Sequence, residues 1–200
     1  MSHTLNDADL DPADLLKNVS NPLIESGLFK SRTVLITGEI NDRVARGATE
    51  RLLAMAGESD DPITVVVSSP GGHVESGDMI HDMIKFVKPT VRVLGTGWVA
   101  SAGALIFVAA DKEHRFCLPN TRFLLHEPRG GVGGSASEID IQAREVLRMR
   151  ERLNKIFAEQ TGQPLDKIIA DTNRDFWMNA EEAVEYGIVS KIITSSDDIA

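Results

Sequence analysis

Ser101 has the surroundings best suited to nucleophilic chemistry, and it stands in the run WVASAGA at residues 98–104. We expect a strand before it and a helix of small residues after it, over residues 102–110. The N-terminus of that helix would offer free amides and the positive end of its dipole to a developing negative charge. A plain helix N-cap also uses serine, and on these residues alone the cap is the favoured interpretation.

A glycine turn follows another expected strand, in the run SSPGG at residues 68–72. Paired glycines adopt backbone angles closed to other residues and leave their amides unobstructed. Such amides can form half of an oxyanion hole, which stabilises the charge formed when a nucleophile attacks a carbonyl. A tight strand-to-helix turn explains the same residues equally well.

A hydroxyl nucleophile needs a general base, and the chain has five histidines. His126 follows the apolar run FLL, so we place it at a strand terminus, where it would be rigidly held. His73 directly follows the glycine pair and would border the same region. A lone histidine at a strand end is more often structural, and the 30 acidic residues are too many for spacing to choose a partner. The residues alone therefore indicate an acyl-transfer site without assigning its acid.

The elements that must position these groups alternate between strand-like and helix-like segments. Strand, turn and helix in succession indicate an α/β protein with parallel strands and right-handed crossovers. We expect strands at 33–37, 63–68 (buried on both faces), 91–94, 114–118 and 122–126, helices at 41–55, 74–87 and 102–110, and a glycine-bearing turn at Gly95 and Gly97.

A long helix is predicted after the glycine-rich run RGGVGG at 129–134, which we expect to be extended or flexible. Ser135 and Glu138 fit a capping box at its start, and the helix would end near residue 160. A helix of this length would project beyond a small core, so its apolar stripe needs a partner, unless the stripe packs on its own domain. The stripe comprises Ile139, Val146, Met149, Leu153 and Ile156.

Composition limits the class of protein. A net charge of −9 argues against a nucleic-acid-binding surface, and 200 residues fit one domain. The single cysteine, Cys117, lies in an apolar run, which indicates a buried side chain and a reducing compartment. Residues 1–24 are acidic and lack a signal peptide, so we expect a loosely ordered arm before a domain over 25–200. No apolar run reaches the length of a membrane span, and we expect a cytoplasmic protein.

Six motifs, taken together, resemble the proteolytic subunit of the Clp protease, a family of serine peptidases. They follow one order with family-like separations and cover residues 28–193, nearly the whole chain. Each motif alone is weak evidence, whereas six in register are strong evidence. The motifs are SPGG (69–72), GWVASAGA (97–104), LPN (118–120), LHEP (125–128), TNRD (172–175) and AEEAVEYG (180–187).

The resemblance implies a Ser-His-Asp triad. Ser101 would be the nucleophile, His126 the general base, and Asp175 the carboxylate that orients the imidazole and stabilises its cation. The backbone amides of Gly72 and Ala102 would form the oxyanion hole. The implied site uses no metal and no cofactor, and ATP would be used only by a partner unfoldase.

The implied fold is the crotonase-like α/β fold, a ββα spiral with a projecting handle helix at about residues 130–160. In the family, handles join two stacked heptameric rings into a tetradecamer that encloses the active sites. Peptides and unfolded proteins are cleaved in that chamber, as part of protein quality control. The stretch 130–134 matches the segment that pairs with a peptide as an added strand. A homo-oligomer and a partner Clp-type ATPase are therefore implied.

Four features depart from the family pattern. Residues 1–24 lack the segment that forms axial loops and helps to dock the ATPase, and the tyrosines usual before the first strand are absent. Asn173 stands where an acid usually pairs across the rings with the arginine matching Arg174, so that contact would be weaker. Trp98 replaces a smaller polar residue and would reshape the cleft. None of these changes touches the triad.

Other functions use the same scaffold. An acyl-CoA hydratase or isomerase of the crotonase type has a similar oxyanion hole but needs no Ser-His-Asp set. A catalytically weak or regulatory ring subunit, assembling with an active paralogue, would tolerate the altered N-terminus and Asn173. A membrane-tethered signal-peptide peptidase shares the fold, but the sequence offers no anchor for it.

Overall fold

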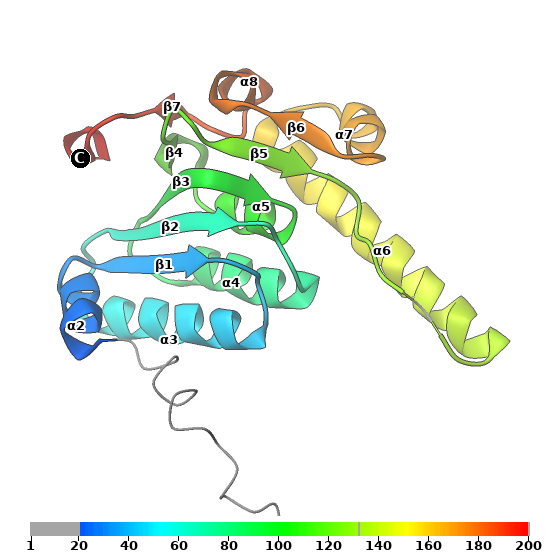
Figure 1. Cartoon of the computed structure of the whole chain (residues 1–200), viewed down its shortest axis with the longest axis horizontal. Coiled ribbons are helices and arrows are strands. Elements are labelled where there is room, and N and C mark those ends of the chain that lie inside the picture. Colours follow the sequence, from blue (N-terminus) through cyan, green and yellow to red (C-terminus); the bar gives the residue numbers. More distant parts are fainter. Residues whose placement is uncertain (1–20, 132, 200) are drawn as a thin grey trace, which may run out of the picture.

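The computed structural model describes residues 21–131 and 133–199, which form a twisted sheet with helices packed against it (Figure 1). The strands are β1 (Thr33–Thr37), β2 (Ile63–Ser69), β3 (Val91–Ala100), β4 (Arg115–Cys117), β5 (Arg122–Leu125), β6 (Phe176–Met178) and β7 (Lys191–Ile192). The helices are α2 (Pro22–Lys30), α3 (Asp42–Glu58), α4 (Val74–Phe86), α5 (Ala102–Phe107), α6 (Ala136–Thr161), α7 (Leu165–Thr172) and α8 (Ala180–Tyr186), with short 3-10 turns η1 (Lys112–His114) and η2 (Ser196–Ile199).

Parallel strand pairing confirms the predicted α/β architecture. The sheet order is β1-β2-β3-β4-β7, and β5 pairs with both β3 and β6. The first half of β3 pairs with β4 at 93–95, and its last residues pair with β5 at 98–100. Among the described strands, β6 alone runs antiparallel to its neighbour, β5. Because β2, β3 and β5 are parallel, the residues that follow their carboxyl ends gather at one edge of the sheet.

The turn predicted at Gly95 and Gly97 is wrong, because β3 continues through both glycines to Ala100. Gly95 pairs with Cys117 inside the sheet, and a Cβ at Gly95 would lie 3.1 Å from Val99 Cγ2. Glycine at 95 therefore permits close packing within a strand. The helix that follows is also shorter than predicted and ends at Phe107.

The strand β2 is buried on one face only, which corrects the prediction that both faces are covered. Its residues alternate between buried and half-buried positions. The helices α3, α4 and α5 lie together on one side of the sheet (Figure 1). The β-branched run in β2 therefore reflects strand propensity rather than burial on two sides.

An arm is predicted over residues 1–24, and its residues 1–20 lie outside the described part of the chain. Its last residues are helical, because α2 begins at Pro22. The Asn21 side chain accepts a hydrogen bond from the Leu23 amide at 3.0 Å, and proline occupies the first helical position. Both are standard start signals of a helix, and this helix crosses the boundary predicted between the arm and the domain at residue 25.

Helix α6 begins with the predicted capping box, in which the Glu138 carboxylate accepts from the Ser135 amide at 2.7 Å. Its C-terminal half packs on the domain through Leu153 and Phe157, and Arg152 binds Asp78 of α4 at 2.5 and 2.6 Å. Its N-terminal half projects past the sheet (Figure 1). The alternative of packing on its own domain therefore holds for only half of the helix.

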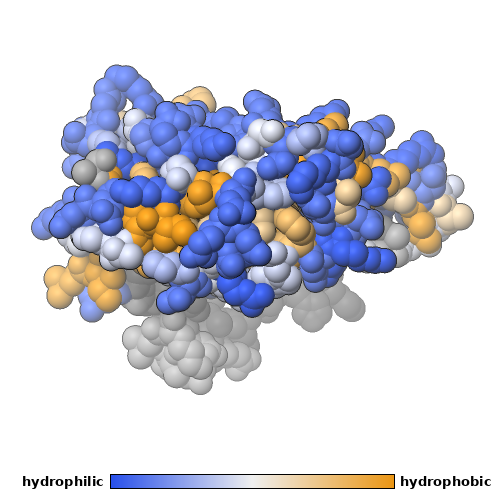
Figure 2. Space-filling model, turned by 90° about the horizontal axis from the view of Figure 1, so that it is seen from above, coloured by the Kyte–Doolittle hydropathy of each residue, from blue (hydrophilic) through white to orange (hydrophobic). Residues whose placement is uncertain are grey.

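The projecting half of α6 exposes apolar side chains, namely Ile139, Ile141 and Leu147. Figure 2 shows apolar surface at the right-hand end of the molecule, where α6 projects. No helix in the described part of the chain is long and apolar enough to cross a membrane. This apolar surface needs another explanation.

Arg115 joins the C-terminal ends of α5 and α6 inside the protein. Its side chain is 1% exposed and donates to the carbonyls of Val108, Ala110 and Gln160 at 3.0, 2.7 and 2.8 Å. Burial lowers the pKa of this guanidinium to about 10. The cation is retained because it satisfies carbonyls that the two helices leave open.

Replacing Arg115 by leucine should lower the free energy of unfolding by about 3 kcal/mol, because buried carbonyls lose their donor. The measurement is urea unfolding at fixed protein concentration. Arg46→Leu is the matched control, since this side chain is 79% exposed and pairs only with Glu50 among the contacts described. The control should stay within about 0.5 kcal/mol of the parent. Equal effects of the two substitutions would contradict the role given to Arg115.

Candidate active site

Ser101 occupies the junction between β3 and α5 in an unusual backbone conformation. Its φ is +55° and its ψ is −121°, and its side chain makes no capping hydrogen bond with α5. The interpretation of Ser101 as a plain N-cap is therefore wrong. A non-glycine residue with positive φ stores strain, and such a strand-to-helix elbow exposes a nucleophile at the edge of the sheet. Its amide donates to the Leu124 carbonyl at 2.9 Å, which ties the elbow to β5.

The glycine turn after β2 lies directly against Ser101. A Cβ at Gly71 would lie 2.6 Å from Ser101 Cβ, and one at Gly72 would lie 2.2 Å from the Ile40 carbonyl oxygen. Both glycines have positive φ, of +97° and +148°. Only glycine therefore fits at these two positions. A tight turn alone would not impose so strict a steric limit.

Two backbone amides are available beside the Ser101 side chain. The Gly72 amide carries no hydrogen bond within the described part of the chain. Ala102 is the first residue of α5, so its amide has no partner within the helix. Together with the positive end of the short helix, these amides are suited to stabilising an oxyanion.

His126 immediately follows β5 and meets Asp175, which lies 49 residues further along the chain. Nδ1 of His126 lies 3.0 Å from Oδ1 of Asp175. Because a carboxylate oxygen only accepts hydrogen bonds, the ring proton of His126 is on Nδ1. Its Nε2 is therefore unprotonated and can accept a proton. The amide of Glu127 donates to the Thr172 carbonyl at 2.8 Å, which fixes the two segments together.

Ser101 and His126 line one small pocket. The two side chains share it without a mutual hydrogen bond in this structure, and such bonds commonly form only when a substrate binds. The other walls are almost entirely apolar and come from α4, α5, α6 and the segment after β5. The lining residues are Val74, Ser101, Ala102, Leu105, Leu125, His126, Pro128, Leu153 and Phe157.

Asp175 is held ionised by its neighbours. The hydrogen bond from His126 is the main cause that lowers the pKa of Asp175, and Arg129 adds to the effect. The Arg129 guanidinium donates to Oδ1 of Asp175, the same oxygen that His126 uses. Sequence reasoning missed Arg129, because a cation at the start of a glycine-rich run carries no signal of its own.

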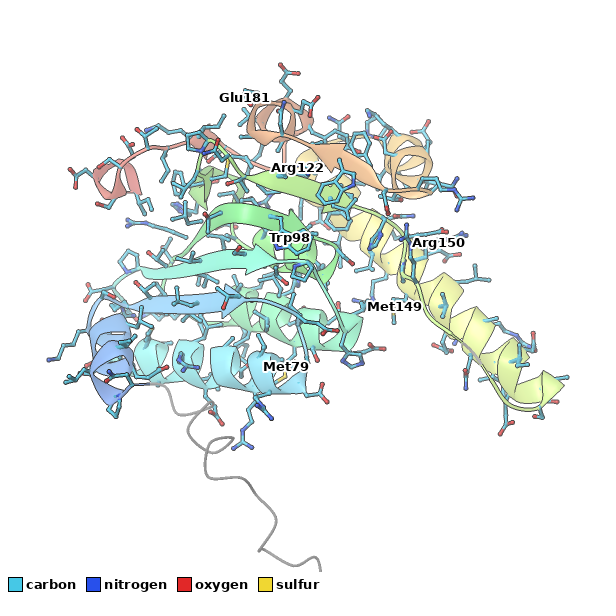
Figure 3. The ribbon with its side chains drawn as sticks, viewed as in Figure 1. Met79, Trp98, Arg122, Met149, Arg150 and Glu181 are labelled. Atoms are coloured by element: carbon cyan, nitrogen blue, oxygen red, sulfur yellow. The ribbon has the colours of Figure 1, made fainter. Side chains whose placement is uncertain are left out.

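The remaining candidates lie away from this pocket. His73 borders the glycine turn, but its Nδ1 lies 2.8 Å from Ser76 Oγ. Cys117 is buried, and burial raises the pKa of its thiol to about 12, which agrees with the prediction of a structural cysteine. Trp98 is not among the pocket residues and pairs in register with Arg122 of β5 (Figure 3). No cluster that could hold a metal ion occurs among the described residues.

Comparisons with known proteins agree in pointing to one family. The family described as Clp protease matches residues 18–196. The ATP-dependent Clp protease proteolytic subunit 3 of Rhizobium etli is 63% identical over 175 residues, which cover 88% of this chain and 90% of that protein. Subunit 2 of Pseudomonas aeruginosa is 55% identical over 194 residues, covering 97% and 96%. The structure of ClpP1 from Listeria monocytogenes superposes with a TM-score of 0.81 at 52% identity, covering 88% of this chain and 99% of that one.

The fit of the glycine turn against Ser101 can be tested by stability alone. Gly71→Ala should lower the free energy of unfolding by about 2 kcal/mol or more, because the added Cβ overlaps Ser101 and the φ is unfavourable. Gly57→Ala, in the open last turn of α3, should raise it by about 0.5 kcal/mol. Thermal and urea unfolding would check the sign of both changes in the free energy of unfolding. An unchanged free energy for Gly71→Ala would show that the turn is packed less tightly than described.

Proposed function

This chain belongs to the Clp protease family as a serine-peptidase subunit, and we propose that it cleaves peptide bonds with Ser101, His126 and Asp175 as its triad. One observation carries the assignment. Ser101 and the His126 ring line one pocket, while Asp175 binds the ring nitrogen of His126 that would face away from the nucleophile. This is the order of contacts that a triad requires.

The chemistry follows from these positions. His126 Nε2 takes the proton of the Ser101 hydroxyl as Oγ attacks the scissile carbonyl, and Asp175 stabilises the imidazolium that forms. The oxyanion is held by the amides of Gly72 and Ala102. His126 then gives its proton to the leaving amine, and an acyl-enzyme remains on Ser101. Water, activated by the same imidazole, releases the new carboxyl end. The sequence of steps needs no metal and no cofactor.

The walls of the pocket favour particular substrates. Leu105, Leu125 and Phe157 offer apolar surface beside Ser101, which suits an apolar side chain before the scissile bond. Beyond Pro128 the chain is glycine-rich, and a Cβ placed at Gly130, Gly131 or Gly133 would meet nothing within 4 Å. Open backbone of this kind can pair with an extended peptide, so unfolded segments are the proposed substrates.

A second copy of the chain is the proposed partner of the projecting half of α6. Its exposed apolar side chains belong to a helix that its own domain cannot cover. We propose two stacked heptameric rings joined by these helices, in the cytoplasm, with the active sites inside. The relatives named above are called ATP-dependent, which supports a Clp-type ATPase that feeds the chamber and alone consumes ATP.

The triad is tested by labelling with a serine-directed fluorophosphonate, read by intact mass and peptide mapping. One adduct on Ser101 is expected, together with cleavage of a fluorogenic peptide that has an apolar residue before the scissile bond. Ser101→Ala should lose the adduct and at least about 10³-fold in cleavage while keeping its sedimentation profile. Retained cleavage in that variant would refute the assignment, and an unlabelled but assembled parent would favour a regulatory ring subunit.

The assembly role of α6 is tested by adding one charge to its stripe. Ile139→Glu should release single rings or smaller species in sedimentation velocity, because a carboxylate would be buried against the neighbouring ring. Ser137→Glu adds the same charge on the side of α6 opposite the stripe, one turn before Ile141, and should change the profile less than Ile139→Glu does. Identical profiles for the two variants would exclude contacts through this stripe.

A further inference from the structure

The segment that carries Arg129 is fixed at several points before it reaches the arginine. Glu127 donates its amide to the Thr172 carbonyl, and its carboxylate lies 3.3 Å from Arg150 of α6. Figure 3 shows Arg150 where α6 passes this segment. Pro128 has a fixed φ and lines the Ser101 pocket. Arg129 thus leaves a rigid stretch of backbone and is directed at Asp175.

Arg129 and His126 bind the same oxygen of Asp175. Both donate to Oδ1, one from a guanidinium and the other from a ring nitrogen. Arg129 is itself 60% exposed, and an exposed ion pair adds little to stability. The carboxylate that it binds, however, also orients the proposed base. A change at Arg129 therefore affects His126 through the shared Asp175 carboxylate.

We propose that Arg129 is a positioning residue for the proposed triad, holding the Asp175 carboxylate toward His126 and limiting the negative charge that His126 experiences. The inference rests on the proposed function of the triad, in which Arg129 has no assigned part. The two effects have separate signatures. Loss of positioning lowers the rate of the chemical step, whereas loss of the cation makes His126 easier to protonate.

The other charged side chains near this pair do not replace Arg129. Glu127 and Arg150 pair with each other, and Arg174 precedes Asp175 in the chain without contacting its carboxylate. Within the described residues, His126 and Arg129 are the groups bound to the Asp175 carboxylate. Removing the Arg129 charge should therefore change the pH dependence in one direction only.

The test compares Arg129→Gln with Arg129→Lys in the assembled protein, using fluorogenic peptide cleavage across pH. Arg129→Gln should lower kcat about fivefold with KM within about twofold, and should move the acid limb of the kcat/KM profile upward by about half a pH unit. Arg129→Lys retains the positive charge, so the acid limb of its kcat/KM profile should match that of the parent. Arg46→Gln, which removes an exposed arginine of α3, is the control and should match the parent.

Two outcomes would overturn the proposal. One is a profile and kcat equal to those of the parent, and the other is a rise in KM at constant kcat, which would make Arg129 a substrate contact. A measurement that needs no turnover distinguishes failure of the Arg129 proposal from failure of the proposed triad. In Ser101→Ala protein, histidine-ring NMR should show the titration midpoint of His126 moving upward on adding Arg129→Gln. An unchanged midpoint would overturn the proposal, whereas absence of Ser101 labelling in the parent would count against the proposed function alone.

Discussion

The backbone turn at Ser101 is the constraint on which the rest of the site depends. A residue with φ of +55° and a side chain costs about 1–3 kcal/mol of strain, which its surroundings must offset. Those surroundings are specific: the Ser101 amide is bound to Leu124, the Leu105 amide donates to the Ser101 carbonyl at 3.2 Å, and Gly71 packs on the Ser101 Cβ. Each contact comes from a different element, so the elbow can form only once β2, β3 and β5 are aligned.

Strand pairing supplies that alignment. The register between β2 and β3 shifts after the pair Val67–Gly95, so that Ser69 pairs with Val99, and beyond this irregularity β3 pairs with β5 instead of β4. This change of partner places His126, which follows β5, at the same edge of the sheet as Ser101. The antiparallel strand β6 then returns along β5, with Phe176 opposite Leu125, and this brings Asp175 beside His126. Three residues that are distant in sequence lie near one edge of the sheet because β5 is placed between β3 and β6.

The sequence predicts some of this and not the rest, for physical reasons. Local signals were sufficient for β1, for the capping box of α6 and for the position of Ser101 between strand and helix, since each depends on neighbouring residues. The pairing of His126 with Asp175 could not be derived locally, because it depends on the sheet order, and only the resemblance indicated it. Gly95 was misinterpreted as a turn because a glycine needed for close packing looks the same in sequence as a glycine needed for a bend. Arg129 was missed for a similar reason, as its partner is fixed by tertiary structure.

Helix α6 links the pocket to the surface that would meet another subunit. Its buried half supplies Leu153 and Phe157 to the pocket wall, and Arg150 and Arg152 attach it to the segment after β5 and to α4. Its exposed half is a continuation of the same hydrogen-bonded rod, with no glycine or proline between Ala136 and Thr161. A force on the exposed half must therefore either bend the helix or move residues beside Ser101 and His126. Because the attachments are ion pairs at the surface and apolar contacts inside, displacement costs least at the surface end, where a neighbouring subunit would bind.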